Sequence, residues 1–170
     1  MFVEKDFLTI PENAGRLIGS DWMLISAGTP KDFNTMTASW GGLGYLWNRP
    51  VAYIFIRPQR HTYSFVEQAD YFSVCFFEDK YREILNYCGR VSGKDFDKAK
   101  ETGLKVLNYK DQAVYYEQAR LVLICRKLYH QDLKPDFFHD PSILGVYPQK
   151  DYHRMYIGEI VQTLVAPESK

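Results

Sequence analysis

The most informative stretch of this chain is residues 34–42, which alternate small hydroxyl residues with apolar ones before ending in Gly41 and Gly42. A period of two is that of a β-strand, so the stretch predicts a strand with two unlike faces. The two glycines favour close approach to the backbone. The alternative is an ordinary half-buried strand, because threonine favours strands. The hydroxyl face carries Thr35, Thr37 and Ser39, and the apolar face carries Met36, Ala38 and Trp40.

A second polar cluster, residues 57–62, follows an apolar run. Arg57 presents a planar fork of N–H donors that suits a phosphate, and His61 and Thr62 add a ring N–H and a hydroxyl. If a helix begins here, its free N–H groups and its dipole also favour an anion. The strand and this cluster together suggest a site for a flat, phosphorylated ligand. The alternative is a solvated turn with surface charges.

A third segment, residues 91–98, contains Ser92 and Asp95 three positions apart, as in a capping box before a short helix. A glycine and a lysine here superficially suggest a P-loop. However, Asp95 stands where a P-loop needs the Ser or Thr that holds Mg²⁺, which excludes an NTPase. A capped surface helix is the simplest interpretation of this segment by itself.

The three segments, in this order and spacing, resemble the flavin reductase-like family, whose members bind FMN in a Greek-key split β-barrel. The resemblance covers roughly residues 22–103 and is weaker at residues 156–161. It implies that the strand lies along the flavin and that the second cluster meets the phosphate. The third segment would lie beside the ring edge or the phosphate. The implied FMN contacts are Thr37, Ala38, Ser39, Trp40, Arg57, Pro58, Gln59, His61, Thr62, Ser92, Gly93, Asp95 and Lys98.

For four single residues, both a functional and a purely structural interpretation stay open. The resemblance implies that His153 and Arg154 approach the open face of the flavin and contact nicotinamide or substrate, whereas a surface pair on a loop is the simpler explanation. Trp40 is equally credible as a core aromatic and as a ligand contact. Cys88 adjoins the third segment, where a thiol near flavin could be redox-active, although a buried cysteine usually only packs.

The function implied by the resemblance is that of an FMN-dependent NAD(P)H oxidoreductase. Hydride would pass from NAD(P)H to the flavin, and electrons onward to free flavin or to a protein or small-molecule acceptor. Because the cofactor carries this chemistry, no catalytic side chain is expected. The alternatives are a flavin-binding electron carrier without NAD(P)H oxidation and a flavin-free binding module on the same barrel. Family members are typically homodimers, and a homodimer is expected here on that basis.

Composition narrows the class of protein. The chain has 170 residues, 46% of them hydrophobic, which suits one domain over residues 1–170. Lys plus Arg and Asp plus Glu both number 21, and without a basic excess we expect no nucleic-acid partner. The histidines and cysteines lack metal-ligand spacing, so no metal site is expected. Without a secretory signal or a long apolar run, we expect a cytoplasmic protein that has no membrane partner.

The pattern along the chain is a string of strands with short helices inserted. Six or so antiparallel strands without βαβ units favour a closed or partly closed barrel, mainly β with an α+β character. Gly89 and Gly103 are expected to cap two helices in the left-handed conformation. We predict strands at 22–27, 35–40, 51–57, 71–77, 119–128 and 155–165, helices at 61–70, 81–88 and 95–102, and mainly loop at 131–150.

Overall fold

A computed structural model describes residues 2–167 of the chain. Its strands, in chain order, are β1 (Val3–Lys5), β2 (Met23–Thr29), β3 (Asp32–Ala38), β4 (Gly41–Leu46), β5 (Arg49–Ile56), β6 (Tyr71–Phe76), β7 (Val106–Tyr109), β8 (Ala113–Tyr116), β9 (Leu121–Asp132) and β10 (Arg154–Val165). Eight of them form one antiparallel sheet, and β7 and β8 form a separate hairpin. The mainly-β prediction is therefore confirmed.

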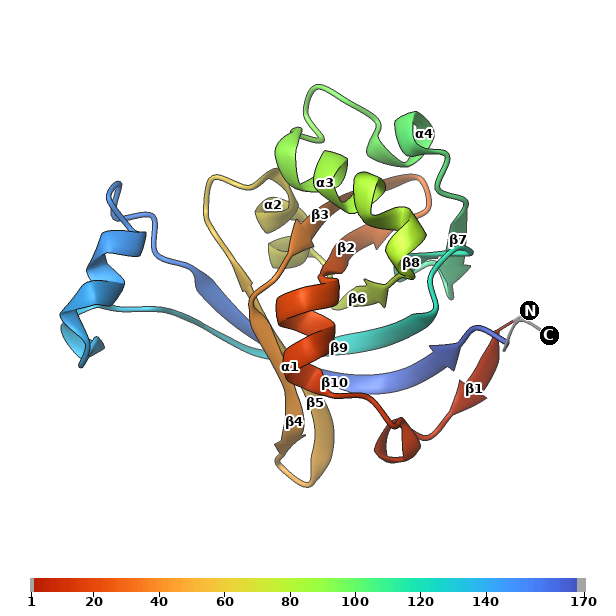
Figure 1. The fold of residues 1–170 in the computed structure, drawn as a ribbon, viewed down its shortest axis with the longest axis horizontal. Helices are drawn as coiled ribbons and strands as arrows, with labels where there is room; N and C mark the ends of the chain where they lie inside the picture. The colour runs from red at the N-terminus through yellow and green to blue at the C-terminus, as the bar shows by residue number, and fades with distance from the viewer. Residues whose placement is uncertain (1, 168–170) are drawn as a thin grey trace.

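Short helices fill the connections (Figure 1). They are α1 (Ala14–Arg16), the π-helical turn η2 (Leu17–Asp21), α2 (His61–Gln68), α3 (Arg82–Arg90), α4 (Lys98–Thr102) and the 3₁₀ turns η1 (Phe7–Thr9), η3 (Asp79–Tyr81), η4 (Pro135–Phe137) and η5 (Pro141–Val146). Among the helices of residues 2–167, none combines the length and the apolar character needed to cross a membrane.

The order of strands requires the sheet to curl. Along the sheet the order is β3-β2-β6-β9-β10-β5-β4, with β1 paired to β10 outside this path. Only Ser39 and Trp40 separate β3 from β4 in the chain, yet these strands occupy opposite edges. A connection of two residues can span only about 10 Å. The two edges must therefore lie close together, which makes the sheet a barrel that is split along the line between β3 and β4.

Alternate residues of the strands supply two separate cores, as the strand period of two requires. Ile25 and Val74 are opposite each other in register and point into the barrel core, which η2 and α2 also enter through Leu17 and Val66. Their chain neighbours point to the other face. That face packs under α3, α4 and β8 and forms the outer core, which includes Leu24, Cys75, Leu85, Ala99 and Tyr116.

Several predicted boundaries need correction. The strand predicted at 35–40 begins at Asp32 and ends at Ala38, so the chain leaves the sheet before Trp40. Gly103 caps α4 with φ 69°, as predicted. The prediction for Gly89 is wrong, because this residue lies inside α3, which Val91 ends in an extended conformation. The capping box is also wrong, since α4 begins later and Asp97 caps it.

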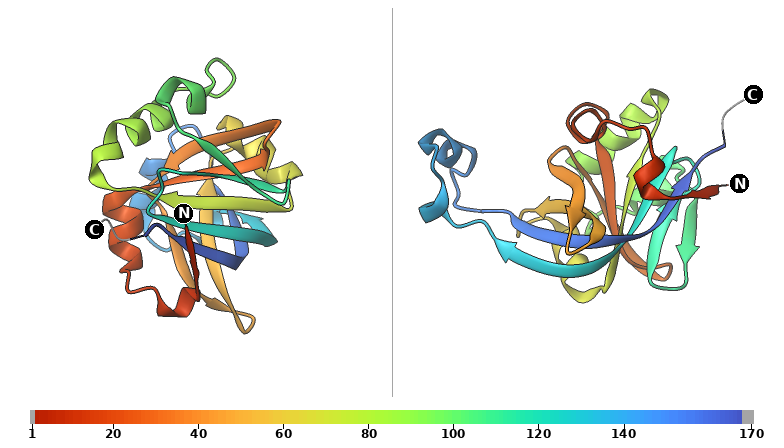
Figure 2. Two further views of the ribbon diagram at one scale, coloured as in Figure 1. Left: turned by 90° about the vertical axis from the view of Figure 1, so that its right-hand side faces the viewer. Right: turned by 90° about the horizontal axis from the view of Figure 1, so that it is seen from below.

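The region predicted as loop at 131–150 is only partly irregular. Strand β9 continues to Asp132, and residues 133–153, here called the arm, carry η4 and η5. Figure 1 shows the arm projecting from the sheet on the left, and Figure 2 shows the same projection from below. Strands β1, β4, β7 and β8 were not predicted. They are short or rich in glycine, so their patterns fall below what strand signals require.

The close contact of β10 with the barrel core gives a test of packing. A Cβ on Gly158 would lie 2.5 Å from Phe72 Cζ and 2.9 Å from Cys125 Cβ, at a register shift between β9 and β10. Gly158→Ala should therefore lower the free energy of unfolding by about 1–3 kcal/mol, because the core has no room for the methyl group. In the matched control Gly44→Ala, the new Cβ meets Tyr53 at an ordinary 3.4 Å. Urea unfolding of both variants measures this, and equal stabilities would contradict it.

The three thiols are buried, and their reactivity gives a second test. Burial raises the pKa of Cys88 to about 11 and that of Cys75 to about 12, and it also raises the pKa of Cys125. Because the thiolate is the reactive form, a thiol reagent at pH 7.5 should modify the native protein very slowly and all three cysteines after denaturation. Rapid native labelling of Cys88 would instead support a redox role.

Candidate functional site

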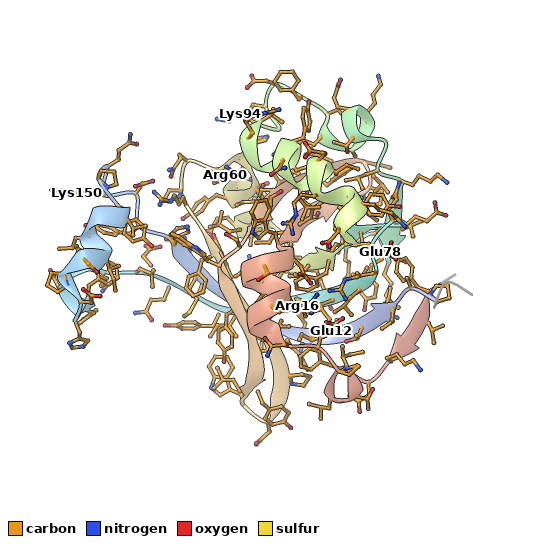
Figure 3. The ribbon with its side chains drawn as sticks, in the orientation of Figure 1. Glu12, Arg16, Arg60, Glu78, Lys94 and Lys150 are labelled. Carbon is orange, nitrogen blue, oxygen red and sulfur yellow. The ribbon has the colours of Figure 1, made fainter. Side chains whose placement is uncertain are left out.

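Two hollows adjoin where β3, the β5–α2 loop and the end of α3 meet. The first, here called the strand-side hollow, has a volume of about 200 Å³ and is lined by Met36, Thr37, Ala38, Ser39, Trp40, Phe55, Arg57, Arg60 and His153. The second, here called the cationic hollow, has about 170 Å³ and is lined by Asn34, Gln59, Arg60, His61, Thr62, Arg90, Val91, Ser92, Gly93 and Lys98. Arg60 lines both, so the two hollows are neighbours. Figure 3 labels Arg60, which stands below the loop that carries Lys94.

Strand β3 presents its free edge to the strand-side hollow, because it pairs only with β2. Its hydroxyl groups hold the strand in place. Thr37 Oγ1 donates to the carbonyl of Leu85 in α3, and the buried Thr35 hydroxyl bonds to Ser26 and to the carbonyl of Ile25. A hydroxyl that is bonded internally is less available to a ligand. In this hollow the Thr37 hydroxyl is therefore less available to a ligand than the main chain of β3.

Trp40 is not a core aromatic. Its side chain is 49% exposed, and its ring lies 5.2 Å from the ring of His153, centroid to centroid. His153 itself is buried and does not form the surface pair considered from the sequence. Burial, together with the positive charge of Arg57, lowers the pKa of His153 to about 4, and Asp151 opposes this shift. The imidazole is therefore uncharged at neutral pH.

Arg57 lies in the strand-side hollow and not in the cationic hollow. Its Nη1 atom donates to Asp151 Oδ2 at 2.6 Å, and Nη2 donates to the carbonyl of Val146 at 3.1 Å. Gln59 donates to the same carboxylate oxygen, and both donors lower the pKa of Asp151. Because a carboxylate offsets its charge, Arg57 is poorly suited to the phosphate role that the sequence suggested. No sequence pattern pointed to Asp151, because the arm brings it to the site from far along the chain.

The cationic hollow collects three positive side chains. They are Arg60, Arg90 and Lys98, and the described residues that line the hollow include no Asp or Glu. Lys98 is 4% exposed, and its Nζ atom donates to the carbonyls of Thr35 and Cys88, at 2.8 Å each. Burial lowers the pKa of Lys98 to about 8. Arg60 Nη1 donates to the carbonyl of Gly89 at 2.9 Å. Main-chain oxygens therefore hold Lys98 and Arg60 and leave their charge uncompensated.

The N-terminus of α2 adds further donors to this hollow. Helix α2 begins at His61, directly after Arg60, and no side chain caps it. Free N–H groups and the helix dipole favour an anion at such an end. Asn34 Nδ2 donates to Thr62 Oγ1 at 2.8 Å, which ties β3 to this turn. Gly93 packs against Asn34 so closely that a Cβ would lie 1.8 Å from Asn34 Oδ1.

The structure thus brings most of the predicted site residues together and leaves three aside. Pro58 and Asp95 are exposed and line neither hollow. Arg154 also lies outside both, because its guanidinium is held by Asp132, at 2.6 Å, and by Glu67, at 3.0 Å. No cluster of three or more potential metal-binding side chains occurs within residues 2–167. The site residues that sequence reasoning missed are Asn34, Met36, Phe55, Arg60, Arg90 and Val91.

Similar folds occur in solved structures. They include an FMN-binding domain of a flavin reductases-like enzyme from Shewanella baltica, with a TM-score of 0.70, 17% identity, and coverage of 97% of this chain and 77% of that one. A flavoredoxin from Methanosarcina acetivorans has a TM-score of 0.67, 21% identity and coverage of 87% and 69%. An NADH:FAD oxidoreductase from Streptomyces globisporus, in complex with NAD and FAD fragments, has a TM-score of 0.65, 14% identity and coverage of 88% and 77%.

At these identities the structures establish the split-barrel fold alone. No curated protein matches the chain. The family model for the flavin reductase like domain matches residues 15–170, which is nearly the whole chain. The chain therefore belongs to the flavin reductase like domain family.

Proposed function

We propose that this protein binds FMN across the two hollows, with the phosphate in the cationic hollow and the ring system in the strand-side hollow. The observation that carries this proposal is the cluster of Arg60, Arg90 and Lys98 without a carboxylate, next to the free end of α2. A phosphate carries nearly two negative charges at neutral pH and needs several donors. Arginine, lysine and helix N–H groups are the donors that phosphates meet most often in proteins.

The strand-side hollow suits a flat ring. Its walls are the free edge of β3, the aromatic side chains of Trp40 and Phe55, and the uncharged imidazole of His153. Aromatic walls with a few placed polar groups are typical of cofactor sites. The two hollows share Arg60, so one ligand that has a ring and a phosphate can occupy both.

The proposed reaction is the oxidation of NAD(P)H with transfer of electrons to free flavin or to another acceptor. FMN, when bound, supplies the hydride-accepting and electron-transferring chemistry. The chain's own residues would orient the ring through β3 and Trp40. The Arg57 side chain, held in place by Asp151 and by the carbonyl of Val146, would form part of the wall beside the ring. The Streptomyces relative, solved with NAD and FAD fragments, supports the nicotinamide part of this proposal.

The protein is also proposed to act as a homodimer. Large apolar side chains are exposed on the arm, notably Phe137, Ile143, Leu144 and Val146. Exposed apolar patches commonly mark interfaces. Analytical ultracentrifugation gives the oligomeric state directly, and a monomer at micromolar concentration would refute this part of the proposal.

The test of function begins with an absorption spectrum of the purified protein and a titration with FMN. Quenched FMN fluorescence is expected, and a protein that neither holds nor quenches FMN would be a flavin-free module. NADH and NADPH are then added separately without oxygen. Loss of the oxidised flavin absorbance is expected with at least one of them. If the flavin stays oxidised with both, an electron carrier such as a flavoredoxin becomes the better assignment.

The division between the two hollows predicts different roles for two arginines. Arg90→Ala should weaken FMN binding by about ten- to a hundredfold and riboflavin binding little, because only FMN has a phosphate and a charge-assisted hydrogen bond contributes about 1.5–3 kcal/mol. Arg57→Ala should weaken both ligands to a similar degree. Fluorescence titrations measure these affinities. Arg16→Ala, at an exposed arginine outside both hollows, serves as the control.

The result that would count against this division is a selective loss of FMN affinity in Arg57→Ala together with wild-type affinity in Arg90→Ala. That pattern would return the phosphate to Arg57, as the sequence alone suggested.

The lowered pKa of Lys98 predicts that FMN affinity depends on pH. Its pKa falls from an ordinary 10.5 to about 8 in the folded chain, so the ammonium group loses its charge as the pH rises through 8. FMN affinity should therefore fall from pH 7 to pH 9, while riboflavin affinity should change little. Over pH 8–10.5 the unfolded chain binds more protons at this lysine, so the group makes unfolding less favourable as the pH rises. Weaker binding would thus not reflect unfolding. In Lys98→Met the dependence should disappear, and an unchanged dependence would assign it to another group.

A further inference from the structure

The base of the arm holds a hydrogen bond that is not part of the proposed FMN contacts. Tyr147 is buried, and its hydroxyl oxygen lies 2.8 Å from His153 Nδ1. The two rings meet edge to face, with centroids 5.5 Å apart and an interplanar angle of 78°. Apart from the backbone N–H of His153, which can only donate to the hydroxyl oxygen, the hydroxyl has no other hydrogen-bond partner among the described residues. Its proton therefore has one protein acceptor at most, which is the imidazole.

The direction of this bond follows from the chemistry of the two groups. A neutral imidazole has one N–H donor and one bare nitrogen acceptor. The phenol is the more acidic donor, and the bare imidazole nitrogen is the more basic acceptor. If Nδ1 donated instead, the buried phenolic proton would have no partner, which is unfavourable. The Tyr147 hydroxyl therefore donates to Nδ1 of His153.

This direction places the imidazole proton on Nε2. Within residues 2–167, Asp151 Oδ1 is the one side-chain polar atom sealed from solvent without a partner. Nε2 of His153 also has no protein partner, so it must reach solvent. His153 lines the strand-side hollow, and its opposite nitrogen faces Tyr147. Nε2–H is therefore the edge of the ring that the hollow exposes.

Burial keeps the imidazole of His153 neutral, and the charge of Arg57 adds to this effect. The Arg57 guanidinium lies over the Tyr147 ring, with Cζ 5.0 Å from the ring centroid. Its charge and the burial of His153 disfavour the imidazolium, while Asp151 favours it. Asp151 is itself held by Arg57 and Gln59, so its carboxylate is largely compensated. An uncharged N–H group donates to an acceptor oxygen without requiring the ligand to be an anion.

We propose that Tyr147 is a positioning residue that fixes His153 as the Nε2–H tautomer, so that the imidazole donates a hydrogen bond to a carbonyl oxygen of the ligand in the strand-side hollow. The identity of that ligand rests on the proposed function. Both a flavin ring and the carboxamide of nicotinamide offer such an oxygen. The tautomer of the imidazole depends only on the contacts of His153 in the folded chain, and not on which ligand binds.

The tautomer is measured on the flavin-free protein by two-dimensional ¹H–¹⁵N NMR of the histidine rings at pH 7.5, with His153→Gln used to assign the signals. In the wild type we expect a protonated Nε2 and a bare Nδ1. Tyr147→Phe should give a mixture of the two tautomers. Tyr152→Phe is the matched control, because Tyr152 belongs to the same aromatic cluster and its hydroxyl has no hydrogen-bond partner among the described residues.

A protonated Nδ1 in the wild type, or a tautomer unchanged in Tyr147→Phe, would overturn the positioning role. Near-ultraviolet circular dichroism tells whether Tyr147→Phe retains its fold. If it does not, the wild-type spectrum alone decides, since it reports the tautomer directly. This measurement contains no flavin, so its outcome is independent of whether FMN is the ligand.

The donor role is tested by comparing His153→Leu with His153→Gln, whose amide N–H can replace Nε2–H. His153→Leu should bind its ligand about tenfold more weakly, and His153→Gln should restore most of the affinity. A loss in riboflavin titrations would identify a flavin carbonyl as the acceptor. A loss confined to NADH titrations of the FMN-loaded protein would identify the carboxamide. If His153→Leu binds both ligands as tightly as the wild type, the donor role is wrong. Failure of the wild type to bind riboflavin or FMN would instead refute the proposed function.

Discussion

The last turn of α3 ends in carbonyl groups, and the whole candidate site depends on what these carbonyls accept. Carbonyls at a helix C-terminus lack helical partners and carry partial negative charge, which suits cations. Here the carbonyls of Cys88 and Gly89 accept from Lys98 and Arg60. The carbonyl of Leu85, which lies one turn earlier in the helix, accepts from Thr37, so three separate parts of the chain are tied to one helix. Because the groups that hold Lys98 and Arg60 are neutral oxygens, these two side chains are fixed in position while their positive charge remains available to an anion.

The type of hydrogen-bond partner also explains why Arg57 and Arg60, three positions apart, differ in how much of their charge is compensated. Arg57 is paired with a carboxylate from the arm, so little of its charge remains for a ligand. Arg60 is held by a carbonyl, so the hollow that it shares with Arg90 and Lys98 is strongly positive. A ligand with a neutral ring at one end and a phosphate at the other meets an environment that matches each end. The polarity of the site would thus orient such a ligand.

Much of this arrangement could be predicted, because it depends on residues that are close together in the sequence. The alternating pattern before Gly41 predicted β3, and the polar cluster after β5 predicted the turn into α2. What could not be predicted depends on long-range pairing. Tyr147 and Asp151 reach the site only because β9 and β10 carry the arm there. The hydroxyls of β3 followed the expected alternation, but only the fold reveals that internal carbonyls accept their protons. Gly89 was predicted to cap the helix, because the sequence does not tell which N–H group forms the last hydrogen bond of the helix.

The split between β3 and β4 has a further consequence. The two strands are consecutive in the chain but lie at opposite edges of the sheet, and no ladder of main-chain hydrogen bonds joins them. The strand-side hollow lies beside this seam, with β3 and the Ser39–Trp40 link on one side and Phe55 of β5 on the other. A molecule seated there would bridge edges that the chain itself leaves unjoined. Binding in this hollow would therefore hold the two edges together and stabilise the closed form of the barrel.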